Sequence, residues 1–299
     1  MLSIIFTIIG AILQTFRNLE QKALSKKFDT LTVSWSRFIL PLPLAIIAVF
    51  LTFSNVGQQF INLCLITAIF QIGGNFLLIE TFRSKNFSIG VAFYKTEVLQ
   101  TLILGLLFFN QSISNLGFLL IILTSFGVFL MSNLSLKIKN FNFSQKAILF
   151  GLLAGFCFSI SAFNLKFASE SLYALGYSKF LAPTIVLLWV ILLQNIIFIV
   201  IKSSQNRLLS DLKKLLSSEN RFSFLKTSLL SFVGSLFWFF AFALGNVIYV
   251  KAVGQIEMVF AVLASHFYLR EKHSKREFIG IAVTTIGILS LIFLSNIHV

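Results

Sequence analysis

The chain has 299 residues, of which 57% are hydrophobic, 15% are aromatic and only 11% are charged, and its formal net charge is +14. Soluble domains carry about 25% charged residues, so this chain has too few charges to cover a water-facing surface. The composition excludes a soluble globular protein and indicates a membrane protein. The basic residues lie in short connections between apolar segments, which indicates membrane orientation and not nucleic-acid binding.

Ten apolar segments are long enough to cross a bilayer, which requires about 20 residues per helix. We expect helices in all of them, because lipid offers no partner for free backbone groups and no segment alternates like a barrel strand. The first segment lacks a basic leader and a small-residue cleavage site, so it is interpreted as a membrane span. The predicted spans are 3–23, 32–52, 60–81, 89–109, 116–134, 147–167, 179–201, 224–244, 248–268 and 277–296.

The sequence contains an internal repeat. Residues 74–127 align without a gap on residues 234–287, with ten identities in 54 positions. One of these identities places Glu97 opposite Glu257, and both acids lie within apolar runs. A duplicated membrane bundle with matching buried acids is typical of transporters.

The repeat predicts two halves of five helices each, over 1–138 and 139–299. A second match, between SRFILP at 36–41 and SKFLAP at 178–183, supports this division. Because five is an odd number, the second half should enter the membrane upside down relative to the first. The halves should then be related by a pseudo-two-fold axis in the membrane plane.

Lysine and arginine predict the orientation. Eighteen of the 24 lie in or beside the connections on one side of the predicted bundle, and only Lys166 and Lys179 lie near the opposite surface. The positive-inside rule therefore places both termini outside the cytoplasm. The longest connection, 202–223, has its leucines on one helical face, which predicts a short amphipathic helix on the anionic leaflet. A solvated linker is the alternative.

Glu97 and Glu257 are the leading candidate functional residues. Each lies within about 3 Å of the midpoint of its predicted helix, and a charge at that depth costs at least about 2.5 kcal/mol. We interpret both as proton-coupling or ligand-binding acids; the alternative is that they pair with cations only for packing. Lys95 precedes Glu97 by two residues and points to a different helix face, so we expect it to contact another helix or the substrate.

The buried arginines need acceptors, because arginine keeps its charge in proteins. Arg37 is a candidate anion-binding residue, at the place that Lys179 takes in the second half. Arg17 is interpreted as the local partner of Glu20, three residues further along the same helix. Lys251 could either reach the membrane interface or face the bundle.

Further candidates come from aromatic, proline and glycine positions. Tyr94 and Trp238 lie deep in their spans and combine a ring with a polar group, so they are candidates to line a cavity. Pro41 and Pro183 match across the repeat, and the bends that prolines impose are candidate gating points or static kinks. GLLAG at 151–155 has the small-residue spacing of close helix packing.

No catalytic or metal-binding pattern is recognisable in the sequence. Cys64 and Cys157 lie in separate apolar runs and the three histidines are scattered. We therefore expect no metal, no cofactor and no disulfide framework. The sequence also lacks a Gly-rich phosphate loop and a nucleophile–base pair, which argues against an enzyme.

Two stretches of the chain resemble a known family. VKAVGQIEMVFAVLASHFYLREK at 250–272 is similar to the closing pattern of the EamA family, in the drug/metabolite transporter superfamily, and 16–46 resembles that family's first two helices. The resemblance implies ten helices in two repeats and movement of small metabolites across the bacterial inner membrane, by exchange or proton coupling. One departure is that Glu271 ends the second repeat, whereas Gln111 stands at the matching place in the first.

The sequence thus predicts an all-helical secondary transporter that moves a small polar metabolite by alternating access. The cargo would be an amino acid or another organic anion or zwitterion, bound near the midplane between the halves. Alternatives are an efflux carrier for apolar or cationic drug-like solutes, a channel, and a membrane-embedded enzyme acting on a lipid-linked substrate. The expected partners are the cargo and lipid, without nucleic acid, and the protein would be a monomer or homodimer.

Overall fold

The computed structural model describes residues 1–83, 93–131, 141–268 and 274–297, with side chains described for 1–81, 93–131, 146–263 and 274–294. Within these residues the fold is helical and contains no strand, which confirms the all-helical part of the predicted fold class. The elements are α1 (Leu2–Leu24), α2 (Thr30–Trp35), α3 (Leu42–Thr52), η1 (Phe53–Asn55), α4 (Gln58–Arg83), α6 (Glu97–Leu107), α7 (Asn115–Met131), α8 (Phe141–Ala174), α9 (Leu181–Ser204), α10 (Leu208–Leu216), α11 (Arg221–Leu244), α12 (Val247–Gly254), α13 (Ile256–Tyr268) and α14 (Lys275–Ile297).

Six of these helices are long and apolar enough to cross a membrane, namely α1, α4, α8, α9, α11 and α14. The other predicted spans correspond to shorter or interrupted helices. Residues 36–41 separate α2 from α3, α6 begins only at Glu97, and Gln255 separates α12 from α13. The expectation of uninterrupted helices over 32–52, 89–109 and 248–268 was therefore wrong. At the first break, Pro41 lacks the N–H that a continuous helix requires.

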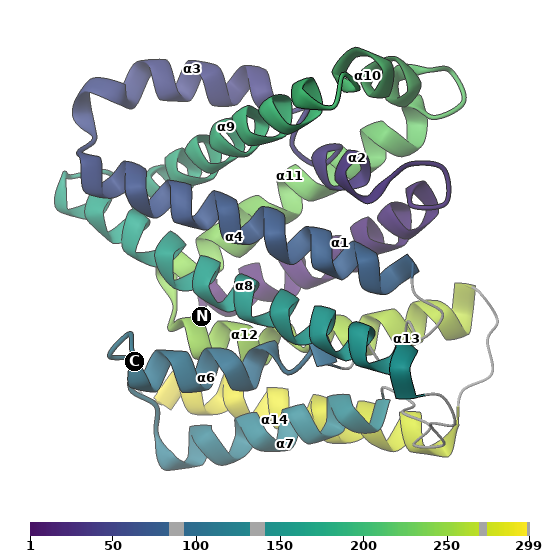
Figure 1. Ribbon diagram of the computed structural model, residues 1–299. Coiled ribbons are helices and arrows are strands. Elements are labelled where there is room, and N and C mark those ends of the chain that lie inside the picture. Colours follow the sequence, from purple (N-terminus) through teal and green to yellow (C-terminus); the bar gives the residue numbers. More distant parts are fainter. Residues whose placement is uncertain (84–92, 132–140, 269–273, 298–299) are drawn as a thin grey trace.

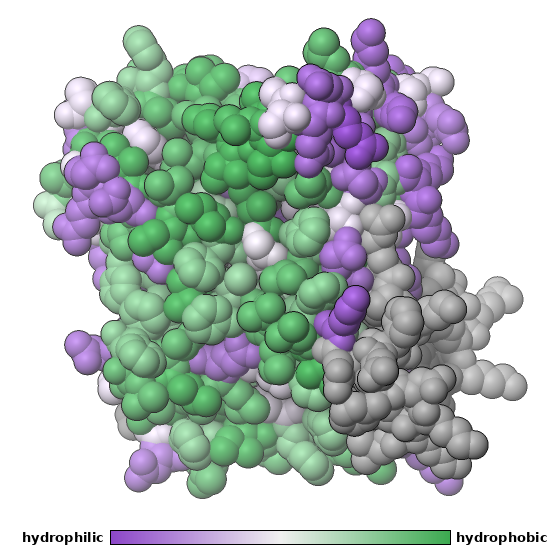
Figure 2. All heavy atoms as spheres, in the orientation of Figure 1, coloured by the Kyte–Doolittle hydropathy of each residue, from purple (hydrophilic) through white to green (hydrophobic). Residues whose placement is uncertain are grey.

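The outer surface suits a lipid environment. The start of α1 and the end of α14 lie at one end of the bundle, and α10 lies at the other (Figure 1). Apolar side chains cover most of the face drawn in Figure 2, and polar side chains gather toward its ends. Phe50, Leu107 and Phe293 are at least 70% exposed. Such exposure of large apolar groups is unfavourable in water and favourable in lipid.

The main helix pairings join the first half of the chain to the second. Among the described elements, α1 packs along α11, α4 along α8, α3 along α9 and α7 along α14, and α6 contacts both α8 and α12. The core of the molecule therefore lies between the halves, where the two sets of helices meet.

The crossing of α7 and α14 depends on two glycines. A Cβ added to Gly127 would lie 2.7 Å from the backbone nitrogen of Thr284, and a Cβ added to Gly287 would lie 2.6 Å from Cγ2 of Thr124. Only glycine permits so close an approach. The contact is reciprocal, because each glycine meets the threonine of the other helix.

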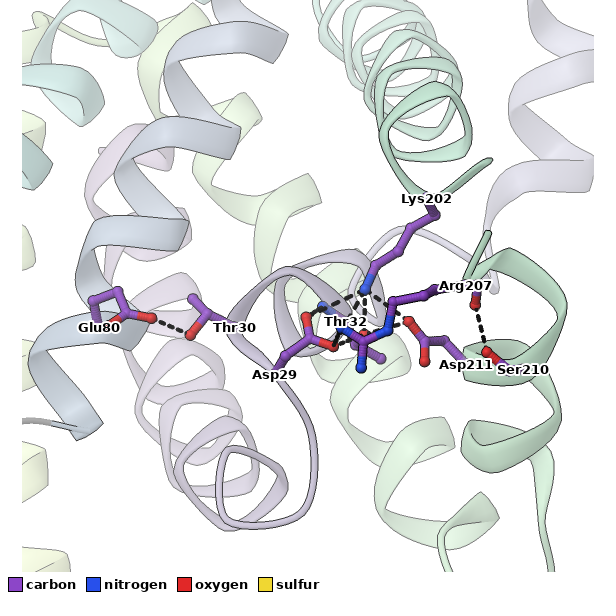
Figure 3. Close-up of polar contacts among 8 residues, drawn as sticks. All are labelled: Asp29, Thr30, Thr32, Glu80, Lys202, Arg207, Ser210 and Asp211. Carbon is purple, nitrogen blue, oxygen red and sulfur yellow. Dashed lines mark hydrogen bonds and ion pairs between the residues drawn. The ribbon is translucent and has the colours of Figure 1, made fainter. Parts of the chain in front are cut away.

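A buried charge cluster lies at the α10 end of the bundle (Figure 3). Lys202, near the end of α9, is fully buried, and its Nζ donates to Asp211 of α10 at 2.7 Å and to Asp29 at 3.2 Å. It also donates to Oγ1 of Thr32 at 2.6 Å. Asp29 in turn caps α2 by accepting from the backbone N–H of Thr32 at 2.9 Å. One lysine thus holds α2, α9 and α10 together.

The amphipathic helix predicted within 202–223 is confirmed as α10. Its inner face carries Leu215, which is fully buried, beside Asp211. Leu209 and Leu216 are 71% and 55% exposed, so part of the leucine face points away from the bundle. These exposed leucines fit the prediction that α10 lies on a membrane surface.

Replacing Lys202 by Met should destabilise the protein by about 3 kcal/mol, because it leaves the buried carboxylate of Asp211 without its cation. Asp29 is 34% exposed and retains Arg207 at 3.9 Å. Thermal unfolding of the purified protein in detergent would measure the loss. Lys213→Met, on the exposed side of α10, is the matched control and should unfold at nearly the wild-type temperature. Equal unfolding temperatures for the two variants would contradict a structural role for the cluster.

The same cluster predicts a pH dependence. Burial raises the pKa of Asp29, but the hydrogen bonds from Thr32 and the nearby Lys202 ammonium outweigh that effect, so the pKa lies below its ordinary value. The stabilisation by ionised Asp29 should be complete above about pH 4, the ordinary range of an aspartate, and should be lost as the pH falls further. In Lys202→Met this acid-dependent loss should be smaller.

Candidate functional site

A cavity of about 80 Å³ lies between the two halves of the chain. It has room for several water molecules or a small polar solute. Residues from α1, α4, α6, α8, α11, α12 and α13 line it. The lining includes all six side chains that the sequence predicted for substrate or proton binding, which are Tyr94, Lys95, Glu97, Arg37, Trp238 and Glu257.

Two crossed ion pairs span the cavity. Nζ of Lys95 lies 2.6 Å from the carboxylate of Glu257, and Lys251 pairs with the carboxylate of Glu97. Each acid therefore takes its lysine from the other half of the chain. All four side chains are at most 12% exposed. At this depth an ion pair is weakly screened, so it resists separation of the halves strongly.

The helix breaks place the two acids. Glu97 begins α6 and Glu257 lies in the first turn of α13, so each carboxylate sits at the N-terminus of a helix. The free N–H groups and the helix dipole at such an end favour negative charge. In the middle of an uninterrupted helix, the acids would have neither free N–H groups nor a helix N-terminus beside them. The breaks thus make the centre of an apolar bundle tolerable for two carboxylates.

The acids differ in how many partners they have. Glu257 accepts from Lys95, from Nε2 of Gln14 at 2.8 Å and from Nδ2 of Asn18 at 2.8 Å. Among the described side chains, Glu97 has two such partners, the ammonium of Lys251 and the hydroxyl of Tyr94. Glu257 is therefore held by three side chains, from α1 and from the segment before α6, whereas two side chains hold Glu97.

Two glycines position the walls of the cavity. A Cβ on Gly155 of α8 would lie 3.2 Å from Cα of Glu97 and from the carbonyl oxygen of Tyr94, so α8 approaches the backbone before α6 closely. This confirms the close packing predicted for one end of GLLAG. Gly254, just before the break at Gln255, faces the indole of Trp238. The Nε1 atom of that indole is buried and has no hydrogen-bond partner among the described residues.

Both buried arginines face the cavity. Arg37 is 6% exposed, and its Nη1 donates to Oδ1 of Asn75 at 2.6 Å. Arg17 is 4% exposed, and its Nη2 donates to Oδ1 of Asn18 at 3.0 Å. Within the described residues neither forms an ion pair, since Glu20 pairs with Lys226 at 3.6 Å. The prediction that Arg17 pairs with Glu20 was therefore wrong.

Sequence reasoning missed several lining residues. The sequence left open whether Lys251 reaches the membrane interface or faces the bundle. In the structure it pairs with Glu97 inside the cavity. The lining residues Gln14 and Arg17 were not assigned to the site, nor was Asn18, which donates to Glu257. With Gln21 they form a polar stripe at helical spacing along α1. That spacing of 14, 17, 18 and 21 is a signal from which the cavity-facing side of α1 could have been predicted.

The other predicted positions lie outside the cavity. Pro41 precedes α3 at the break after α2, whereas Pro183 lies in the first turn of α9, where a proline removes no helical hydrogen bond. A bend caused by proline is therefore expected only at Pro41. Lys179, the counterpart of Arg37, is exposed. Glu271, which the sequence comparison singled out opposite Gln111, lies outside the described residues.

A charged cavity within a bundle of apolar helices is typical of membrane transporters. The chain belongs to the EamA-like transporter family, whose sequence profile matches residues 1–133 and 145–293. This confirms the resemblance found in the sequence. A solved structure, described as "Crystal structure of protein", is similar in fold, with a TM-score of 0.71 and 12% identity over 97% of this chain and 96% of that one. A search of curated proteins found no match.

Reversing one crossed ion pair tests the geometry. Lys251→Glu alone should strongly destabilise the protein, because it places two buried carboxylates together. Combining it with Glu97→Lys restores opposite charges and should recover most of the unfolding temperature. The coupling between the two changes, measured by thermal unfolding in detergent, should exceed about 1 kcal/mol. Additive losses would show that Lys251 and Glu97 do not interact in the folded protein.

Proposed function

We propose that this chain is a secondary transporter that moves a small polar metabolite across the bacterial inner membrane by alternating access. The cargo class is an amino acid or another organic anion or zwitterion. The observation that carries the proposal is the charged cavity between the halves, crossed by two ion pairs that each join one half to the other. Family membership supports transport and leaves the cargo open.

The helix pairings support two inverted repeats of five helices, over 1–138 and 139–299. Exchanging the halves converts the α1–α11 pairing into the α8–α4 pairing, and it leaves the α3–α9 and α7–α14 pairings unchanged. An internal two-fold axis produces this kind of reciprocity. The mutual Gly–Thr contacts of α7 and α14 follow the same pattern. Ten crossings would place both termini on one side, and the basic connections favour the periplasmic side.

The crossed ion pairs suggest how the halves could move. A change from one access state to the other requires the halves to shift against each other, so at least one pair must weaken. Protonation of Glu97 would remove the charge that attracts Lys251, and Glu97 has fewer partners to retain it than Glu257 has. Glu97 is therefore the better candidate for coupling transport to protons. Pro41, between α2 and α3, remains a candidate gating point, whereas Pro183, in the first turn of α9, does not.

The alternatives are less well supported. Aromatic side chains such as Phe158 and Phe242 line part of the cavity, which would suit the apolar solutes of an efflux carrier. Four basic side chains in the same lining disfavour a cationic cargo. For a membrane-embedded enzyme, the described residues include no group of three or more His, Cys, Asp or Glu that could hold a metal ion.

Neutralising Glu97 tests the coupling role. In proteoliposomes, Glu97→Gln should lower exchange of labelled glutamate, succinate or alanine, whichever the wild type carries, by at least about tenfold, as expected for loss of a positioned proton-transfer group. It should also flatten the pH dependence of uptake. Glu20→Gln, an acid on α1 outside the cavity lining, is the control and should transport normally. Unchanged rate and pH dependence in Glu97→Gln would remove Glu97 from the mechanism.

A further inference from the structure

The charges that line the cavity do not balance. Four cationic side chains, Arg17, Arg37, Lys95 and Lys251, face two carboxylates, which leaves a net charge of +2. Both carboxylates are already in ion pairs with the lysines. The excess positive charge therefore belongs to the two arginines, which have no anionic partner within ion-pair distance among the described side chains.

Each arginine also retains unused hydrogen-bond donors. A guanidinium has five N–H groups, and Nε of Arg17 and Nε of Arg37 are buried without a partner among the described residues. Both side chains line the same cavity, so their positive charges face the same space. Two neighbouring buried cations with free donors are costly unless an anion joins them.

Arg37 is held ready for such a ligand. Asn75 accepts from Arg37 through Oδ1, and its own Nδ2 donates to Oγ of Ser34 at 2.7 Å, which fixes the orientation of the amide. The guanidinium also lies over the ring of Phe38, with its Cζ 5.1 Å from the ring centroid. A side chain fixed in this way loses little freedom when it binds an anion.

We propose that the cargo carries a carboxylate or phosphate group that binds between Arg17 and Arg37, and that the cargo is a net anion. This inference rests on the proposed transport function and narrows its substrate class. Planar guanidinium groups match the oxygens of carboxylate and phosphate in bidentate geometry. A zwitterion is less well matched, because its ammonium group would have to compete with Lys95 or Lys251 for Glu257 or Glu97. Nε1 of Trp238, which has no partner among the described residues, adds one more donor for an oxygen-rich ligand.

Binding of four probes to the purified full-length protein tests the proposal. Succinate and inorganic phosphate represent the two anionic groups, alanine represents a zwitterion and choline a cation. We expect succinate or phosphate to raise the unfolding temperature at concentrations where alanine and choline have little effect. Which of the two anions acts more strongly distinguishes a carboxylate from a phosphate cargo. Equal or stronger stabilisation by alanine or choline would overturn the proposal.

Two substitutions locate the site. Arg17→Gln and Arg37→Gln should each weaken binding of the active anion by about 10- to 100-fold, the loss expected for a charge-assisted bidentate contact. Arg37→Lys should lose less, since it keeps the charge but not the paired donors. Lys213→Gln, exposed on α10, should bind as the wild type does. Wild-type affinity in both arginine variants would overturn the subsite.

The stability of the ligand-free variants separates binding from a packing role. An unoccupied anion site predicts that Arg17→Gln and Arg37→Gln unfold at the wild-type temperature or above it, because each removes an unpaired buried charge. A purely structural role predicts a lower unfolding temperature in both variants and would overturn the proposal.

Flux in proteoliposomes then separates this inference from the proposed function. Transport of alanine or choline without anion binding would support the transport function and contradict the anion subsite. Anion binding that depends on the arginines, without flux of any of the four probes, would support the anion subsite and contradict the proposed transport function.

Discussion

The structure depends on the need to compensate charges that are buried in an apolar bundle. A lysine or glutamate near the centre of such a bundle is unfavourable unless an opposite charge lies beside it. At the cavity each partner comes from the other half of the chain, as Lys95 binds Glu257 and Lys251 binds Glu97. The pairs thereby hold the halves together and fix the position of the cavity. The helix breaks also compensate buried charge, because each places a helix N-terminus beside an acid.

The two halves share an architecture but have different chemistry. The acids occupy equivalent positions of the repeat, whereas the lysines that bind them do not, being two residues before Glu97 and six before Glu257. Arg37 is buried in the cavity while its counterpart Lys179 is exposed. The cluster around Lys202 involves α10, which comes from the second half alone. Symmetric pairing of helices thus supports a site that is asymmetric in charge, as recognition of an asymmetric solute requires.

The sequence alone predicted the helical class, the family and the two acids at the cavity, Glu97 and Glu257. Hydropathy identified each apolar segment, and the repeat singled out Glu97 and Glu257, both of which line the cavity. The helix breaks were not predictable in the same way, because apolar composition continues through them and only packing and the carboxylates require them. The ion-pair partners of the acids could not be predicted either, because Lys251 and Glu97 are 154 residues apart and no local sequence pattern connects them. The polar stripe on α1 was available in the sequence, and reading it would have replaced the mistaken Arg17–Glu20 pair with a cavity-facing Arg17.

Access to the cavity from each side of the membrane is the most direct test of alternating access. With Cys64 and Cys157 replaced by serine, a cysteine at the cavity residue Ser235 would be labelled in proteoliposomes with a membrane-impermeant maleimide, added to either side. Alternating access predicts labelling from both sides, with the ratio of the two rates shifted by a bound cargo. Labelling from one side only, under every condition in which the protein transports, would contradict it.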